Sequence, residues 1–335
     1  MYSLPERQEE MSLSSRTEPG KLYCTFLFSD TSEWELFVAK ILSEKNLVEH
    51  WFVVEGEYSF KGERIGLCAN EMLENEPRLS MYRSRITIIE NKENFFESAK
   101  LSIKPSLTDS LRNIRNRTLG KLRRKEKIFF SVEKRTRNLA TSSILDVCQD
   151  SDWLLITDVD EILDTAGSRG QYISDKLAEA HGKFLRVSRL RYVFDFDNLD
   201  PQVKFCPIIQ ISLLLGEQPL KISDFRFRQD GLILTAKPLV YEYSYCFSVD
   251  AINRKLQNFA HVGPNNDIFS AALRLNHHFI QPGMDTTNRI WLDQSAPEIE
   301  FHAAYIIENI ANLQTRNINP DYKIARRNEF PELFS

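Results

Sequence analysis

Three acidic side chains crowd together behind an apolar run near the middle of the chain. The run WLLI occupies residues 153–156, and Asp158, Asp160 and Glu161 follow it. In an extended segment alternate side chains point the same way, so Asp158 and Asp160 should face one side together. Two hard oxygen ligands side by side suit Mg²⁺ or Mn²⁺, and such an ion usually also binds substrate phosphates. These residues therefore predict a divalent-metal site for a phosphate-bearing substrate.

The position of the acids favours a binding site over two other interpretations. An uninterrupted apolar run is typical of a strand buried on both faces of a parallel sheet, and ligands bind at the carboxyl ends of such strands. Acids after a strand also commonly cap the next helix. The segment DVDEILDT further resembles the first motif of haloacid-dehalogenase-type phosphatases, in which Asp158 would be a phosphorylated nucleophile. That motif normally opens its domain, whereas about half of this chain precedes it, so the phosphatase is the alternative.

The composition is that of an ordinary globular protein. The 335 residues carry a formal net charge of −4, which gives no general case for nucleic-acid binding. No apolar run approaches the roughly 20 residues that a membrane span requires. Residues 1–20 are polar and lack the apolar core of a signal peptide, so a disordered tail is expected there. The five cysteines show no metal-binding spacing and favour a reducing compartment, so we expect a soluble cytoplasmic protein.

Apolar runs alternate with helical patterns through the first half of the chain. Strands are expected at residues 22–28, 51–54, 86–89 and 153–156, and helices at residues 33–47 and about 134–148. This alternation predicts a parallel sheet with right-handed crossovers, which would form a nucleotide-binding half. Later strands are expected at residues 184–187, 192–196, 208–215 and 232–234, and a helix at residues 298–313. We expect a single α/β domain over residues 21–315, followed by a tail at residues 316–335.

A strongly basic stretch at residues 104–137 stands out in an otherwise acidic protein. Part of it carries a weak helical stripe. The cations could be solvated, or they could bind an anionic acceptor, a membrane surface or a diphosphate under a lid. The sequence leaves these interpretations open, and peripheral membrane contact through the stretch is one of them. The basic residues are Lys104, Arg112, Arg115, Arg117, Lys121, Arg123, Arg124, Lys125, Lys127, Lys134, Arg135 and Arg137.

Several segments follow one another in the order and spacing of one family's motifs. They are FSDTSEWEL at residues 28–36, VVEGEYSFKG at residues 53–62, Glu133 with Arg137 and Asn138, DVDEI at residues 158–162, YEYSYCF at residues 241–247, and Lys255, Leu256 and His261. Together they resemble glycosyltransferase family 17, the inverting β-1,4-N-acetylglucosaminyltransferases that act on N-glycans. The aromatic segment departs from the family, because its Gly-Trp-His start is missing and Glu242 stands where the histidine would be.

The resemblance implies a GT-A-like fold, which is a Rossmann-like, mixed but mostly parallel sheet flanked by helices. Residues 21–165 would bind the nucleotide and residues 166–315 the acceptor. The donor would be a UDP-sugar and the cofactor Mn²⁺ or Mg²⁺. Asp158 and Asp160 would bind the metal and the diphosphate, and His261 would complete the metal shell. The alternatives for that histidine are His277, His278 and His302.

The same resemblance suggests roles for further polar residues. Glu55 would recognise uridine and ribose, because GT-A enzymes often do so at the end of the second strand. Arg137 and Asn138 would bind the diphosphate, since a guanidinium group pairs with two phosphate oxygens.

An inverting reaction also requires a carboxylate that takes the proton of the acceptor hydroxyl. Glu242 is the expected base because it lies in the aromatic segment, and Asp160 is expected to act in catalysis through the metal. Tyr241, Tyr243 and Tyr245 would either stack on sugar or pack in the core. The other candidates for the base are Asp195, Asp197, Asp250 and Asp267.

The expected function is therefore metal-dependent, inverting transfer of a sugar, expected to be GlcNAc, from a UDP-sugar to a glycan or related acceptor hydroxyl. Two alternatives stay open. One is a phosphohydrolase with Asp158 as nucleophile, and the other is a non-catalytic protein that binds nucleotide sugars.

Overall fold

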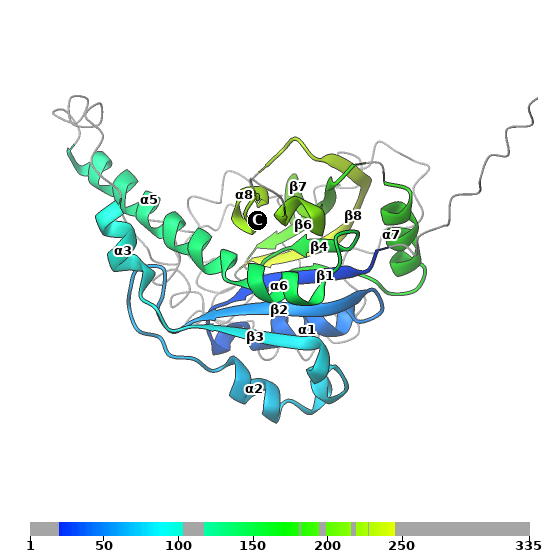
Figure 1. Cartoon of the computed structure of the whole chain (residues 1–335), viewed down its shortest axis with the longest axis horizontal. Coiled ribbons are helices and arrows are strands. Elements are labelled where there is room, and N and C mark those ends of the chain that lie inside the picture. Colours follow the sequence, from blue (N-terminus) through cyan, green and yellow to red (C-terminus); the bar gives the residue numbers. More distant parts are fainter. Residues whose placement is uncertain are drawn as a thin grey trace, which may run out of the picture.

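A mixed sheet of eight strands forms the centre of the molecule, with helices on both of its faces (Figure 1). This computed structural model describes residues 20–102, 117–180, 182–193, 199–215, 219–226 and 228–244. The strands are β1 (Leu22–Phe28), β2 (Val48–Gly56), β3 (Ile86–Asn91), β4 (Trp153–Ile156), β5 (Glu161–Leu163), β6 (Phe184–Val193), β7 (Leu199–Gln210) and β8 (Leu232–Ser244).

The order of the strands across the sheet is β3-β2-β1-β4-β7-β6-β8-β5. The first four strands in this order are parallel to one another. β7 is antiparallel to both β4 and β6, β8 is parallel to β6, and β5 is antiparallel to β8. The expectation of a mostly parallel sheet is therefore wrong. The few residues between β6 and β7 leave no room for the crossover that a parallel pair requires, so these strands pair antiparallel.

The helices cover both faces of the sheet. They are α1 (Trp34–Glu44), α2 (Ala69–Asn75), α3 (Phe95–Ser102), α5 (Arg117–Asn138), α6 (Ala140–Val147), α7 (Arg169–Ala178) and α8 (Ile222–Phe225), together with the 3-10 helices η1 (Thr31–Glu33), η2 (Pro77–Arg85) and η3 (Ile211–Leu214). The alternation of side chains along the strands produces two apolar layers. In β1, Phe26 belongs to the layer that also contains residues of α1 and α7. Tyr23 belongs to the opposite layer, with residues of α6 and α8.

Most of the expected elements of the first half are present. The strand expected at residues 22–28 is confirmed as β1, and those expected at 51–54, 86–89 and 153–156 lie in β2, β3 and β4. The single helix expected at residues 134–148 is wrong, because α5 ends at Asn138 and α6 begins at Ala140. The Asn138 side chain bonds to Ser223 at the start of α8, and this contact ties the end of α5 to another element.

The second half differs more from expectation. One long strand, β6, covers the strand expected at residues 184–187 and the beginning of the one expected at 192–196. The strand expected at 208–215 is the end of β7 followed by η3. The helix expected at 298–313 lies outside the described residues, as do His261, the predicted C-terminal tail and residues 1–19 of the predicted N-terminal tail.

α5 is the longest helix described, at 22 residues, and extends from the sheet beside α3 (Figure 1). A small apolar cluster of Ala99 with Ile128, Phe129 and Val132 joins the two helices. The basic stretch of the sequence thus includes all of α5 except its last residue, Asn138. Across the ranges described above, no helix has both the length and the apolarity needed to cross a membrane.

Candidate functional site

A cavity of about 310 Å³ opens where β1 and β4 end. Segments far apart in the sequence form its walls, including the ends of α5 and β1, the loop after β4, and the facing strands β6, β7 and β8. Its charged lining residues are Glu33, Glu133, Arg137, Asp158, Asp160, Arg189, Arg191, Lys204, Arg226 and Glu242. Charged groups of both signs are therefore concentrated at the sheet edge that the sequence indicated.

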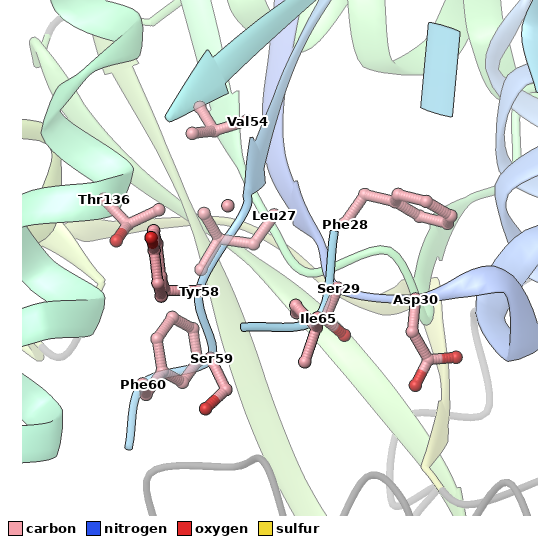
Figure 2. Close-up of a pocket in the computed structure, with 11 residues that line it drawn as sticks. Leu27, Phe28, Ser29, Asp30, Val54, Tyr58, Ser59, Phe60, Ile65 and Thr136 are labelled. Atoms are coloured by element: carbon pink, nitrogen blue, oxygen red, sulfur yellow. The ribbon is translucent and has the colours of Figure 1, made fainter. Parts of the chain in front are cut away.

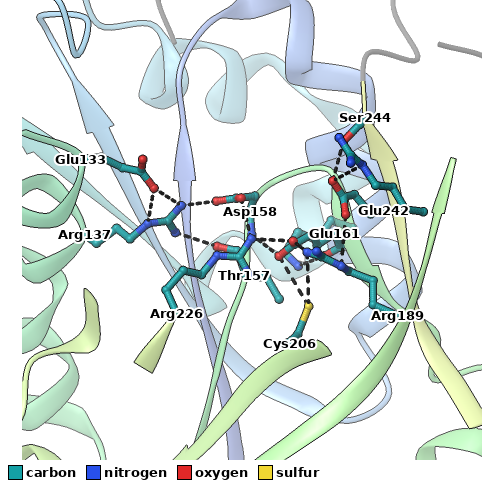
Figure 3. A network of polar contacts seen from close by, with 12 residues as sticks. Glu133, Arg137, Thr157, Asp158, Glu161, Arg189, Cys206, Arg226, Glu242 and Ser244 are labelled. Carbon is teal, nitrogen blue, oxygen red and sulfur yellow. Dashed lines mark hydrogen bonds and ion pairs between the residues drawn. The ribbon is translucent and has the colours of Figure 1, made fainter. Parts of the chain in front are cut away.

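Asp158 is held between two arginines (Figure 3). Its Oδ1 accepts a hydrogen bond from Nη2 of Arg137, and its Oδ2 lies 2.7 Å from Nη2 of Arg226. Arg137 also donates to the carbonyl oxygen of Thr157 at 3.1 Å and to Glu133 at 2.9 Å. Burial opposes ionisation of Asp158, but the two arginine charges outweigh it and hold its pKa well below the ordinary value. Asp158 is therefore an anion whose two oxygens both have cationic partners.

Glu161 orients the loop that carries the two aspartates. It begins β5 and is 1% exposed, so the helix-cap interpretation does not apply to it. Its carboxylate accepts from the backbone N–H of Asp158 at 2.9 Å and from Arg226 at 2.5 Å, and it pairs with Arg189. Because the backbone of Asp158 is bonded to Glu161, the first residue of β5, these bonds fix the turn between β4 and β5.

Asp160 lines the same cavity and is 6% exposed. Its backbone carbonyl accepts from the N–H of Tyr243 at 2.8 Å, which ties it to β8. The predicted proximity of Asp158 and Asp160 is therefore confirmed in one respect, since both residues line one cavity. They reach it from a turn rather than from an extended strand.

Glu242 lies on β8 across the cavity and is held by two arginines of β6. Its Oε2 is 3.1 Å from Nε of Arg189, its Oε1 is 3.0 Å from Nε of Arg191, and Ser244 donates a hydrogen bond to it. Burial opposes its ionisation, but these charges and the hydroxyl lower the pKa of Glu242 to about 2. A carboxylate with so low a pKa is ionised at neutral pH but is a weak base.

We expect Glu242 to make the fold sensitive to acid. Its pKa is lowered on folding, so its stabilising effect is full above the unfolded value of about 4.3 and is lost as the pH falls towards 2. The difference in unfolding free energy between wild type and Glu242→Gln should therefore be largest near pH 7 and should shrink between about pH 4.5 and pH 2. Urea unfolding across this range measures it, with exposed Asp146→Asn as the matched control. A difference that stays constant with pH would contradict the assignment.

Asn138 lies near the site but does not line the cavity. Its side chain accepts from the backbone N–H of Ser223 at 3.0 Å and donates to the Ser223 hydroxyl at 3.2 Å. Because Arg226 directly follows α8, Asn138 helps to position that arginine. A direct contact between Asn138 and a diphosphate stays a prediction.

Glu55 is the next-to-last residue of β2, close to the strand end where it was expected, and its carboxylate accepts hydrogen bonds from the protein itself. It accepts from the backbone N–H groups of Cys68 at 2.7 Å and Ala69 at 3.1 Å, at the start of α2. With 1% exposure, Glu55 binds the N-terminus of this helix. The structure does not place Glu55 in the lining of the large cavity, and recognition of a ribose by it stays a prediction.

A second, smaller cavity of about 40 Å³ adjoins the first, and the two share Leu27, Ser29 and Phe60 (Figure 2). Tyr58 and Phe60 lie next to each other in its lining, together with Ile65. The loop that carries both rings is closed by a hydrogen bond from Gly62 N–H to the Ser59 carbonyl at 2.9 Å. Gly62 has a φ of 86°, which other residues rarely adopt, so the loop conformation depends on this glycine. The result is a narrow apolar slot beside the charged cavity.

The described residues do not fit the expected Mn²⁺ or Mg²⁺. Both oxygens of Asp158 pair with guanidinium groups, so an ion on this carboxylate would lie close to two cations. Unit charges 4 Å apart near a protein surface repel by about 4 kcal/mol, and a divalent ion doubles this. Among the residues that the structure describes, no three His, Cys, Asp or Glu side chains form a group that could hold a metal. The role of His261 as a metal ligand stays a prediction.

The remaining candidate residues are either buried in the core or lie outside the described residues. Tyr241 and Tyr243 are 1% and 0% exposed, so they pack in the core rather than stack on sugar. Among the described residues, Cys24, Cys68, Cys148 and Cys206 carry free thiols. Tyr245 and the other candidate bases, Asp195, Asp197, Asp250 and Asp267, lie outside the described residues.

Four cations of the cavity were not predicted from the sequence, namely Arg189, Arg191, Lys204 and Arg226. The alternation of Arg189 and Arg191 in an apolar strand was a usable signal, because it places both charges on one face of β6. Nothing in the sequence around Arg226 indicates that it reaches Asp158, because 68 residues separate them.

The sequence was also compared with models of known protein families and with curated proteins, and neither comparison finds a match.

Proposed function

We propose that this protein is a glycosyltransferase that moves a sugar, expected to be GlcNAc, from a UDP-sugar to an acceptor hydroxyl. The observation that carries the proposal is the adjacency of the two cavities, which joins an apolar slot to a charged chamber containing Asp158 and Asp160. A nucleotide sugar has the same sequence of parts, because a planar base is followed by a charged diphosphate and a polar sugar. The motifs that resemble glycosyltransferase family 17 support this proposal. A GT-A-type fold is part of what we propose.

The slot suits the base of the donor. Tyr58 and Phe60 offer aromatic surface, and Leu27 and Ile65 offer aliphatic surface. Aromatic side chains stack on nucleobases at about 1–3 kcal/mol per base. With the base in the slot, the diphosphate would extend past Ser29 and Phe60, which both cavities share, towards Arg137 and Arg226.

The position of the cavity supports the same arrangement. Open α/β sheets bind ligands outside the carboxyl ends of their parallel strands. Here β1, β2 and β4 end next to the two cavities, with Ser29 following β1 and Asp158 following β4. The sugar would then lie near Asp160, between β4 and the facing wall of β6 and β8.

The reaction is a single displacement at the sugar carbon. The acceptor oxygen forms a bond to that carbon, the bond from the carbon to the diphosphate oxygen breaks, and UDP leaves with the electron pair. A carboxylate takes the hydroxyl proton. Glu242 is a weak base because its pKa is lowered to about 2, and its oxygens are held by Arg189 and Arg191. We therefore assign the proton to Asp160 and a positioning role to Glu242.

Calorimetric titration with UDP and UDP-GlcNAc tests the proposal. We expect both to bind, and we expect Tyr58→Ala to weaken UDP binding about tenfold, since one lost stacking contact is worth about 1.4 kcal/mol. Tyr172→Ala, which makes the same change on α7 away from both cavities, should alter the Kd by less than about twofold. Failure of UDP to bind would contradict the proposal. Phosphate release from simple phosphoesters that depends on Asp158 would instead favour the phosphohydrolase.

A further inference from the structure

We propose that arginine side chains, with Arg226 as the central one, hold the diphosphate of the donor in place of a divalent metal ion. The inference rests on the proposed function and concerns the same cavity. In this arrangement arginines bind the diphosphate, and no metal ion bound by Asp158 and Asp160 is needed.

The pairing of Asp158 is the first observation. The carboxylate that would be the first metal ligand has Arg137 on one oxygen and Arg226 on the other. Its side chain keeps 28% exposure, which faces the cavity, whereas the two arginine side chains are 5% and 9% exposed. The cations are therefore fixed by the protein, and Asp158 has the role of positioning them rather than of binding a metal.

The way Arg226 is held is the second observation. Its Nη2 donates to Asp158 at 2.7 Å and to Glu161 at 2.5 Å, and the bonds between Asn138 and Ser223 fix the helix that precedes it. Arg226 lines the cavity together with Arg137. A guanidinium group has five N–H donors in a planar fork that matches phosphate oxygens. One nitrogen of Arg226 makes both of these bonds, so phosphate binding can use the other N–H groups of the fork.

The charge of the opposite wall is the third observation. Arg189 and Arg191 on β6 and Lys204 on β7 also line the cavity, and Arg189 lies opposite Lys204 in the strand register. Glu242 and Glu161 neutralise part of this wall. Cations thus stand on both sides of the space next to the apolar slot, where their N–H groups can bind the diphosphate and stabilise the charge that develops as it leaves.

Calorimetric titration of the full chain with UDP separates arginine from metal binding. One arm contains EDTA and the other contains excess MnCl₂, and a third titrates MnCl₂ alone. We expect the Kd for UDP to agree within about twofold between the first two arms, and Mn²⁺ alone to give no saturable binding. UDP binding that requires Mn²⁺ and disappears in EDTA would overturn the inference while leaving the proposed function intact. No UDP binding in either arm would instead contradict the proposed function.

Variants of neighbouring arginines complete the test. Arg226→Ala should weaken UDP binding at least about tenfold in EDTA. Arg226→Lys keeps the charge but not the planar fork, so its Kd for UDP should lie between those of the wild type and Arg226→Ala. Arg228→Ala is the matched control, because Arg228 pairs with Asp230 at the surface, and it should change the Kd by less than about twofold. Equal affinities of the Arg226 and Arg228 variants would overturn the assignment. The Arg226→Lys variant keeps the test valid if the alanine variant does not fold.

Discussion

Replacing Asp160 by asparagine should lower sugar transfer by at least about 100-fold while UDP still binds. Asp160 lines the cavity and is held in place by the backbone N–H of Tyr243. Asparagine has nearly the same shape but cannot accept the hydroxyl proton, and removal of a general base commonly costs about 10²–10⁴-fold. The measurement is the initial rate of UDP release from UDP-GlcNAc with an acceptor panel, beside calorimetric titration of UDP.

The combination of the two readouts identifies the role of Asp160. If Asp160 were a metal ligand, Asp160→Asn would weaken UDP binding in the presence of Mn²⁺ together with transfer. Exposed Asp146 on α6 provides the control, and Asp146→Asn should leave both quantities unchanged. Undiminished transfer by Asp160→Asn would rule out this residue as the base.

Replacing Lys40 by methionine should destabilise the fold by about 3–5 kcal/mol, because it leaves a buried charge without its partner. Lys40 and Glu44 are both 0% exposed, and their side chains are 2.6 Å apart within α1. Lys40 also donates to the carbonyl oxygen of Glu161 at 2.6 Å, so it joins α1 to the start of β5. Urea unfolding at pH 7 measures the change in free energy.

A second substitution tests whether the unpaired charge is the cause. Glu44 also accepts from the Trp51 indole at 2.8 Å and from Leu163 N–H at 3.0 Å, so its replacement must keep an acceptor. The double variant Lys40→Met with Glu44→Gln should recover at least half of the lost stability. Lys176→Met removes a surface pair with Glu179 and should cost less than about 1 kcal/mol. A double variant no more stable than Lys40→Met would show that lost packing is the cause.

The sequence predicted the first half of the fold well because local pattern and tertiary environment agree there. The apolar runs of β1, β2 and β4 are buried on both faces, and a continuous run is the pattern that such strands show. The break after Asn138 could not be predicted. It depends on a contact with Ser223, which lies 85 residues away.

The candidate site was also predicted in part, because its residues belong to local motifs. Asp158, Asp160, Arg137 and Glu242 all line one cavity, as their motifs suggested. Arg226 was missed, because an isolated arginine in a loop has no pattern that distinguishes a surface position from a buried one. Arg189 and Arg191 were missed although their alternation in β6 was a usable signal. The strand β5 was missed as well. Its three residues are too few to show an alternation, and pairing with β8 determines their conformation.

The pairing of β5 with β8 also determines when the site can form as the ribosome makes the chain. Asp158 and Glu161 leave the ribosome after Arg137 but before Arg189 and Arg226, so part of their positive environment does not yet exist. β5 has no partner until β8 is synthesised, and the N–H that fixes Asp160 belongs to Tyr243, near the end of β8. Until residue 244 has left the ribosome, the nascent chain therefore presents an acidic loop and a strand whose edges are unpaired.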